Sequence, residues 1–185
     1  RMAAIETGQP DLIDWQMLSR AERAERVPAI NPLGKVPVVV LDSGEALYDS
    51  PVLCAYVDAR HNGPKLIPAE EPEHWRVLGL EALGDGLAEA VIAVALEQAK
   101  PEGNRSQGVI ERQGGKVAGA LAALDGAAEC FRDPITVGEI AVACALGYME
   151  LRNIAEGWRD NHAALADWYR RMEARASFAE TAPEA

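Results

Sequence analysis

The most chemically suggestive feature of the sequence is Asp49-Ser50-Pro51. Ser50 suits the N-cap of a helix, and Pro51 suits its first position, where the missing N–H costs nothing. The free N–H groups and the positive dipole end of such a helix attract a carboxylate. The neighbouring Asp49 would attract an ammonium group. Together these residues predict a site for an α-amino acid head group, which carries both charges.

A second feature precedes it, at Lys35, Val36 and Pro37. Proline cannot donate a hydrogen bond to a sheet ladder. A cis Val36–Pro37 bond would turn the N–H and C=O groups of Val36 outward, where an extended peptide could pair with them. Lys35 could then take a second carboxylate at the far end of that peptide. A small peptide with an amino-acid head and a carboxylate tail satisfies all of these points.

A hairpin and a helix must position these residues. The apolar, β-branched run at residues 36–41 is typical of a buried strand, and residues 42–44 form a tight-turn sequence. Residues 46–48 predict a short return strand, so the two runs predict a hairpin. Apolar spacing from Ser50 to about His61 predicts the helix that follows.

The sequence NPLGKVP, followed by a strand, a turn and DSP at this spacing, resembles the glutathione-binding half of the cytosolic glutathione S-transferases, specifically the small bacterial ones. The resemblance implies that the proline is cis and that the residue before it pairs with the cysteinyl backbone of glutathione. It also implies that the acidic residue and the serine hold the γ-glutamyl head. On this basis glutathione is the expected co-substrate of Lys35, Val36, Pro37, Asp49 and Ser50.

The first third of the chain predicts most of a thioredoxin-like domain, with a helix at 1–8, a strand at 11–17 and a short helix at 20–26 before the hairpin. That fold begins with a strand feeding the first helix, since parallel strands need a crossover helix between them. Here the sequence opens inside the helix. In the family that the chain resembles, the catalytic Ser, Tyr or Cys lies at this strand–helix junction. We therefore expect the catalytic residue upstream of Arg1 and name none in the chain.

The second half predicts an all-α domain. Residues 64–72 contain three prolines and read as a linker, so the expected domains are 1–63 and 73–185. Long helical patterns at 73–100 and 107–127 predict an antiparallel pair. A last amphipathic helix is predicted at 163–176, with residues 177–179 and Pro183 ending the chain.

Thr136 and Glu139 form a capping-box pattern, and Ile135 with Ile140 can staple the start of the helix. The small-residue helix behind it, up to Leu151, is predicted to be the central buried helix. The resemblance extends to this box, where the family usually has Asp in place of Glu139. The box is expected to be structural.

Asp85 lies between two glycines inside a long helical pattern, which propensity alone would avoid. Close helix approach across a dimer interface would explain the glycines, and Asp85 could then face the partner's ligand. The alternative is a solvated acid on an irregular helix. Cys54 lies one turn after Ser50, but a cysteine between apolar neighbours is more often a small core residue.

Three histidines and four aromatic residues have simpler explanations. His61, His74 and His162 suit surface or capping roles. Aromatic side chains could line an apolar pocket, although core packing explains each equally well; they are Trp75, Phe131, Tyr148 and Trp158.

Composition limits the function further. A formal net charge of −11 over 185 residues argues against nucleic acid and anionic membrane surfaces as partners. The apolar stretches are short and broken by charges, so neither a transmembrane span nor a signal peptide is expected. Cys54, Cys130 and Cys144 lack C-x-x-C spacing and fit a reducing cytoplasm better than a disulfide framework or a metal site. The resemblance implies a cytoplasmic, metal-free homodimer.

Three functions stay open. A Ser or Tyr upstream of Arg1 that donates a hydrogen bond to the glutathione thiolate makes the protein a detoxifying transferase, which conjugates glutathione to small hydrophobic electrophiles. Glutathione-dependent isomerases belong to the same group. A Cys at that position makes it a thiol transferase or reductase that works through a mixed disulfide. A non-catalytic binding module is the third. Because the chain keeps Lys35, Asp49 and Ser50, the enzyme is favoured.

Overall fold

The computed structural model describes residues 1–131 and 133–182. The chain divides into two compact units, Arg1–Ile67 and Pro68–Ala185. The division falls inside the segment 64–72, and the limits 1–63 and 73–185 stay a prediction. Each unit is described separately below.

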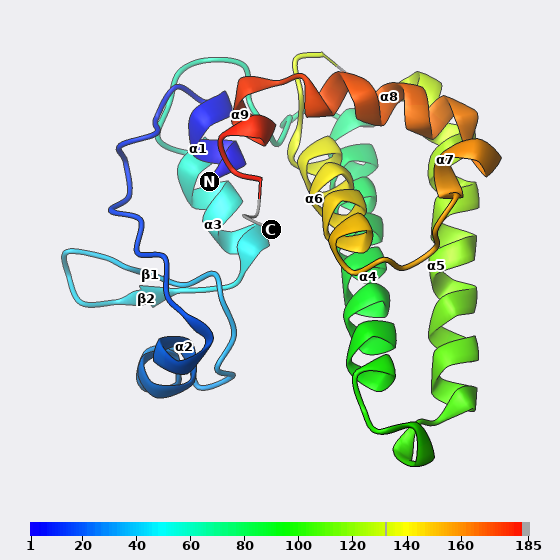
Figure 1. Cartoon of the computed structure of the whole chain (residues 1–185). Coiled ribbons are helices and arrows are strands. Elements are labelled where there is room, and N and C mark those ends of the chain that lie inside the picture. Colours follow the sequence, from blue (N-terminus) through cyan, green and yellow to red (C-terminus); the bar gives the residue numbers. More distant parts are fainter. Residues whose placement is uncertain (132, 183–185) are drawn as a thin grey trace. The chain divides into compact units, whose positions relative to one another are not determined.

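The first unit contains three helices and one hairpin in the described chain (Figure 1). In chain order the elements are α1 (Met2–Glu6), α2 (Arg20–Arg26), the 3-10 turn η1 (Val27–Ala29), β1 (Val39–Val40), β2 (Ala46–Leu47) and α3 (Ser50–Asp58). The short helix at 20–26 is confirmed. It begins at a capping box in which Ser19 and Glu22 bond each other's backbone N–H groups.

The core of this unit forms where α1 packs against α3. Met2, Ala3 and Ala4 on α1 are buried, as are Leu53 and Val57 on α3. A hydrogen bond of 3.1 Å from the Gln9 side-chain amide to the Val57 carbonyl oxygen adds to this contact. The packing fixes the axis of α3, and therefore the direction in which its N-terminus points.

The predicted strand at 11–17 is wrong. The segment is irregular, and Leu12 and Met17 are 38% and 79% exposed. Alternation of apolar and polar residues indicates a strand only when a neighbouring strand accepts its hydrogen bonds. Among residues 1–131 and 133–182, no strand pairs with this segment.

The hairpin is present but shorter than the run of apolar residues predicts. β1 and β2 are antiparallel, with Val39 opposite Leu47 and Val40 opposite Ala46. Gly44 has a φ of +86°, which suits glycine, in the turn that connects the strands. The expected buried strand is also wrong, since Val40 is 54% exposed. β-branched composition favours a strand but does not say what covers it.

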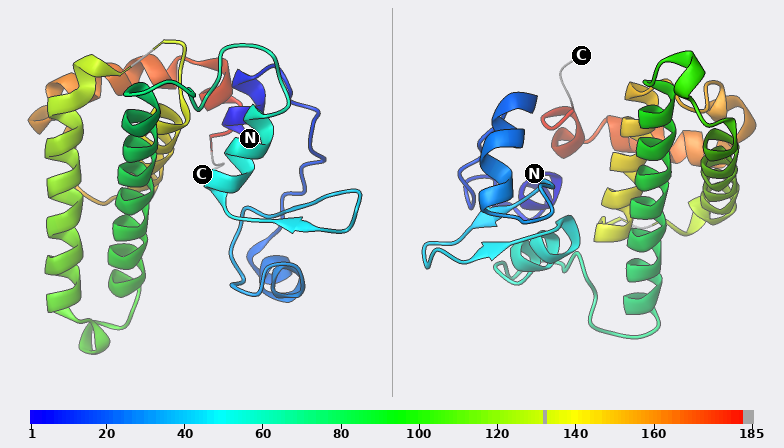
Figure 2. Two further views of the ribbon diagram at one scale, coloured as in Figure 1. Left: turned by 180° about the vertical axis from the view of Figure 1, so that it is seen from behind. Right: turned by 90° about the horizontal axis from the view of Figure 1, so that it is seen from below.

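The second unit contains helices and, among its described residues, no strand. The elements are α4 (Glu73–Gln98), η2 (Glu102–Asn104), α5 (Gln107–Ala127), η3 (Ala128–Cys130), α6 (Val137–Leu151), α7 (Trp158–Asn161), α8 (Ala163–Glu173) and α9 (Ala176–Ala179). Figure 2 shows α4 and α5 as the long antiparallel pair that the sequence predicts. The helix α7 was not predicted. The predicted last helix ends early, at Glu173, and α9 takes the place of an irregular end; Pro183 lies outside the described residues.

The helices α4 and α6 approach each other closely at two glycines. A Cβ atom on Gly84 would lie 2.7 Å from the carbonyl carbon of Ala141, and one on Gly138 would lie 2.9 Å from the carbonyl oxygen of Val77. Gly84 is therefore required by packing within this chain, and the expectation that it serves a dimer interface is wrong. A Cβ on Gly86 would meet nothing within 4 Å.

The predicted capping box at the start of α6 is confirmed and is buried. The Glu139 carboxylate accepts a hydrogen bond of 3.1 Å from the Thr136 N–H and also bonds the Thr136 hydroxyl. Ile135 and Ile140, the predicted staple, are both buried. Glu139 is fully buried, and Arg76 on α4 lies 3.2 Å from its second oxygen. This ion pair is not evident from the sequence, because its partners are far apart in the chain.

Candidate functional site

The predicted site residues gather at one end of the hairpin. The strand pairing places Val39 opposite Leu47. Val36 and Pro37 precede β1, and Asp49 and Ser50 follow β2, so both pairs adjoin the end of the ladder at Val39 and Leu47. The two tripeptides singled out in the sequence therefore share the hairpin end opposite the Gly44 turn.

Asn31 shapes the loop that presents Lys35 and Val36. It is buried, with only 1% of its surface exposed, and its side-chain amide donates a 2.8 Å hydrogen bond to the Lys35 carbonyl oxygen. Its side-chain oxygen accepts a 3.0 Å bond from the Leu33 N–H. Gly34 adopts a φ of +64° between these contacts. The Asn-Pro pair with a following glycine in NPLGKVP is a sequence signal for such a side-chain-closed loop, although the role of Asn31 was not predicted.

Val36 is accessible at this position. The Val36–Pro37 peptide bond is cis, and Val36 is 47% exposed. Within the described residues, no hydrogen bond reaches the backbone N–H or C=O of Val36. An extended ligand could therefore pair with both groups.

The N-terminus of α3 lies at the same end. Asp49, not Ser50 as predicted, is the N-cap, and Ser50 and Pro51 are the first two helical residues. The difference is one residue, which is the usual uncertainty of a helix boundary. The Asp49 carbonyl oxygen accepts the 3.1 Å bond from the Leu53 N–H. In this first turn the N–H groups of Ser50 and Val52 have no intrahelical acceptor.

The α3 terminus is open to solvent. Asp49 is exposed and Ser50 is half-buried. Within the described chain, the Asp49 side chain makes no capping hydrogen bond to the helix. The terminus thus offers a carboxylate oxygen, a hydroxyl and helix N–H groups together.

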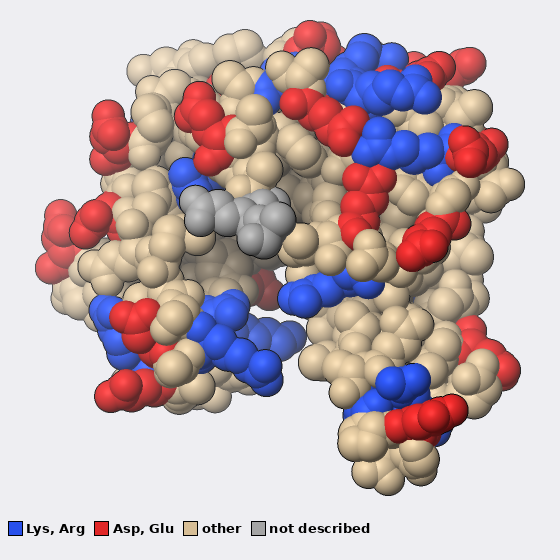
Figure 3. All heavy atoms as spheres, viewed as in Figure 1, with Lys and Arg blue, Asp and Glu red and all other residues tan. Residues whose placement is uncertain are grey.

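The same unit carries exposed cations on α2, at Arg20, Arg23 and Arg26, with acidic side chains among them (Figure 3). Lys35, which precedes the cis bond, is exposed as well.

Two other residues singled out in the sequence lie in this unit. The His61 ring donates to the Asp58 carboxylate over 2.9 Å and accepts from the Gly63 N–H, so it links the end of α3 to the segment that follows; its side chain is 8% exposed, and its bonds are not those of a helix cap. Cys54 lies in α3 and is half-buried.

The described residues contain no group of three or more His, Cys, Asp or Glu side chains that could hold a metal ion. Across the same residues, the helices are too short or too polar to cross a bilayer.

Family models and relatives agree on what this chain is similar to. Residues 1–60 match the glutathione S-transferase N-terminal domain, and residues 107–171 match the C-terminal domain. The uncharacterized GST-like protein YibF of Escherichia coli K12 is 36% identical over 160 residues, covering 85% of this chain and 79% of YibF. The chain belongs to the glutathione S-transferase family. The thioredoxin-like and all-helical organisation predicted from the sequence is that of this family, and is confirmed.

Solved glutathione S-transferase structures superpose on almost the whole chain. A family member from Pseudomonas fluorescens Pf-5, with bound glutathione, is 36% identical with a TM-score of 0.93, covering 100% of this chain and 92% of its own. A glutathione S-transferase from Methylobacillus flagellatus KT, also with glutathione bound, is 38% identical with a TM-score of 0.92, covering 99% and 92%.

Proposed function

We propose that this glutathione S-transferase binds glutathione at the shared end of the hairpin and α3, and transfers it to a small hydrophobic electrophile. The observation that carries the proposal is the open N-terminus of α3, at which an exposed Asp49 is followed by Ser50. An α-amino acid head needs an acceptor for its ammonium and donors for its carboxylate. This terminus supplies both.

Each predicted residue has a role in this proposal. The Val36 backbone pairs with the cysteinyl residue of glutathione after the cis bond to Pro37. Asp49 takes the γ-glutamyl ammonium, and the Ser50 N–H and hydroxyl take its carboxylate. Lys35 takes the glycyl carboxylate. The similarity to two structures with bound glutathione supports the ligand.

The chemical step is attack of the glutathione thiolate, formed by loss of the thiol proton to solvent, on the electrophilic carbon. A C–S bond forms and the bond to the leaving group breaks, so that a chloronitrobenzene releases chloride. With a free thiol pKa near 8.5, about 3% is ionised at pH 7. Half ionisation needs a pKa lower by about 1.5, which corresponds to about 2 kcal/mol. A hydrogen bond to a charged group contributes about 1.5–3 kcal/mol, so one donor to the thiolate is enough. The residues assigned above bind and orient the tripeptide, and none of them is assigned as this donor.

Calorimetric titration with glutathione tests the site. Ser50→Ala removes a hydroxyl that contacts the γ-glutamyl carboxylate, so we expect affinity to fall by about tenfold or more. Ser43→Ala, in the turn at the opposite end of the hairpin, is the matched control and should bind as the unmodified chain does. Equal affinity in Ser50→Ala and Ser43→Ala would refute the assignment. Turnover of an electrophilic chloronitrobenzene, followed by absorbance, tests the transfer itself.

We also propose a homodimer. The support is a groove of about 580 Å³ between α4 and α5, lined by alanine, glycine and leucine residues together with Glu89, Gln113 and Lys116, and the exposed Ile92 and Leu96 on α4. A second copy would cover such a surface. Sedimentation velocity at micromolar concentration tests this, and a monomer alone would contradict it.

A further inference from the structure

Asn31 uses both its backbone and its side chain to close the loop in which it lies. Its N–H donates to the Val27 carbonyl oxygen over 2.8 Å, and its own carbonyl oxygen accepts a 2.8 Å bond from the Gly34 N–H. The side-chain amide donates to the Lys35 carbonyl oxygen over 2.8 Å, and the side-chain oxygen accepts from the Leu33 N–H over 3.0 Å. Only 1% of the residue is exposed. The loop is therefore built around one buried amide.

The bond to Lys35 fixes the direction of a different group, the N–H of Val36. The Lys35 carbonyl and the Val36 N–H belong to the same peptide unit, which is planar and trans. In a trans unit the C=O and N–H groups point in opposite directions. Because the Lys35 oxygen faces the Asn31 amide at 2.8 Å, the Val36 N–H points away from Asn31. Asn31 thus orients a donor that it does not touch.

The same bond makes that N–H a stronger donor. A hydrogen bond accepted by a carbonyl oxygen draws electron density along the peptide unit, and the N–H group at the other end becomes more polar. Val36 is 47% exposed, and within the described residues nothing accepts a hydrogen bond from its N–H. The group is therefore oriented, polarised and accessible to a ligand.

The two side-chain bonds of Asn31 require an amide. The Lys35 carbonyl needs a donor and the Leu33 N–H needs an acceptor. An asparagine side chain carries both, whereas an ionised aspartate carries acceptors alone. An aspartate of the same size would keep the bond from Leu33 and lose the bond to Lys35. The substitution Asn31→Asp therefore isolates the bond that orients Val36.

We propose that Asn31 is a positioning residue for glutathione, which directs and polarises the Val36 N–H toward the cysteinyl carbonyl oxygen of the tripeptide. The identity of the ligand rests on the proposed function, whereas the orientation of the N–H rests on the loop alone. Since the Asn31 side chain is buried and bonded to the loop, it acts through Val36 and not by contact with glutathione.

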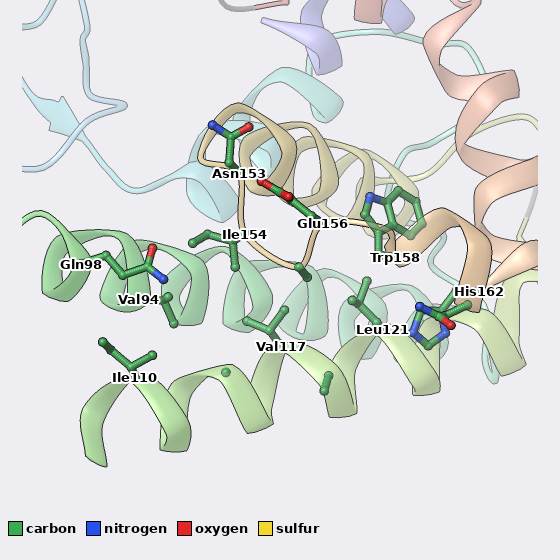
Figure 4. Close-up of a pocket in the computed structure, with 14 residues that line it drawn as sticks. Val94, Gln98, Ile110, Val117, Leu121, Asn153, Ile154, Glu156, Trp158 and His162 are labelled. Carbon is green, nitrogen blue, oxygen red and sulfur yellow. The ribbon is translucent and has the colours of Figure 1, made fainter. Parts of the chain in front are cut away.

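Asn161 in the helical unit provides a matched control. Its side-chain amide also donates to a backbone carbonyl oxygen four residues away in the chain, that of Gly157, over 3.2 Å. Asn161 is among the described residues that line a cavity of about 380 Å³ between α4, α5 and the segment after α6 (Figure 4), and none of those residues is assigned to glutathione. Asn161→Asp makes the same chemical change, with the same added charge, outside the proposed site.

Nuclear magnetic resonance of the Val36 amide tests the orientation without any ligand. A hydrogen bond to the preceding carbonyl moves the nitrogen signal of an amide downfield. We therefore expect the Val36 nitrogen signal to lie further upfield in Asn31→Asp than in the unmodified chain, and to stay unchanged in Asn161→Asp. An unchanged Val36 signal in Asn31→Asp would overturn the inference.

Calorimetric titration with glutathione tests the consequence for binding. Asn31→Asp should raise the dissociation constant about fivefold or more, with the number of sites per chain unchanged, whereas Asn161→Asp should bind within about twofold of the unmodified chain. A side chain that only stabilises the fold would instead lower the number of sites and leave the dissociation constant as it was. That result, or equal affinity in the two variants, would overturn the inference.

A second variant separates the lost donor from the added charge. Asn31→Ala adds no charge and should also raise the dissociation constant about fivefold or more. If circular dichroism shows one of the two Asn31 variants to be unfolded, the other serves for both measurements. Failure of the unmodified chain to bind glutathione would refute the proposed function, and the Val36 signal would still decide whether Asn31 orients the N–H.

Discussion

The N-termini of α3 and α6 both begin at a residue type that suits an N-cap, but the structure leaves one open and closes the other. At α6, Thr136 and Glu139 satisfy each other, the carboxylate is fully buried, and Arg76 reaches it from another helix. At α3, Asp49 is exposed and, in the described chain, makes no capping bond. A closed helix terminus stabilises the fold, whereas an open one leaves its donors for a ligand. This difference assigns Thr136 and Glu139 to the stability of the fold, and Asp49 to the proposed binding of glutathione.

The largest effect on stability is expected at Glu139. Glu139→Ala removes the carboxylate that accepts the hydrogen bonds of the capping box. Arg76 then keeps its ion pair with Glu73, in which a guanidinium nitrogen lies 2.8 Å from a carboxylate oxygen. Loss of one partner of a buried, hydrogen-bonded ion pair typically costs about 3–5 kcal/mol, and since Arg76 is 27% exposed we expect about 2–4 kcal/mol. Urea denaturation measures it. Glu139→Asp, the residue usual in the family, should lose less. A loss below about 1 kcal/mol in the alanine variant would show that the α6 terminus is not closed in this way.

A smaller effect is expected at Thr136. Thr136→Ala deletes the hydroxyl but keeps the backbone N–H that donates to Glu139 over 3.1 Å. Removal of an N-cap hydroxyl costs about 1 kcal/mol, so the midpoint of urea unfolding should fall by less than in Glu139→Ala. A larger loss of stability in Thr136→Ala than in Glu139→Ala would contradict the view that the Glu139 carboxylate contributes most to the capping box.

The smallest effect on stability is expected at Asp49. Because its side chain is exposed and makes no capping bond in the described chain, Asp49→Asn should change the free energy of unfolding by less than about 0.5 kcal/mol. The same variant should weaken glutathione binding, since the ammonium loses its counter-charge. Urea unfolding measures the free energy of unfolding of this variant, and calorimetric titration of the same sample measures its affinity for glutathione. A large loss of folding stability in Asp49→Asn, together with an unchanged affinity for glutathione, would show that Asp49 stabilises the fold and does not bind the ligand.

Local signals predicted much of this molecule. The bounds of α2 and α5, the capping box of α6 and the hairpin follow from caps, turn residues and periodicity over neighbouring residues. The segments Lys35–Pro37 and Asp49–Pro51 were singled out from local sequence signals of the same kind. Their sequence spacing predicts a shared site, which stays a prediction; in the fold the two segments adjoin the same end of the β1–β2 ladder.

Features set by distant contacts escaped prediction. The pairing of Arg76 with Glu139 joins two helices, and Gly84 is required by the backbone of α6. The segment 11–17 has a strand-like pattern, but no described strand pairs with it. The role of Asn31 depends on a bond to a backbone carbonyl that the sequence does not display. Each case depends on a neighbour that local patterns cannot identify.

Asp58, at the far end of α3, has a consequence for affinity. It is buried and accepts hydrogen bonds of 2.7 Å and 3.2 Å from the N–H groups of Leu66 and Ile67. These bonds anchor the helix whose opposite terminus is the proposed site for glutathione. The conformational entropy of that terminus is therefore lost during folding and not on association, so under the proposal more of the contact energy remains as binding affinity. Asp58, a carboxylate outside the proposed site, would thus help to determine how tightly glutathione is held.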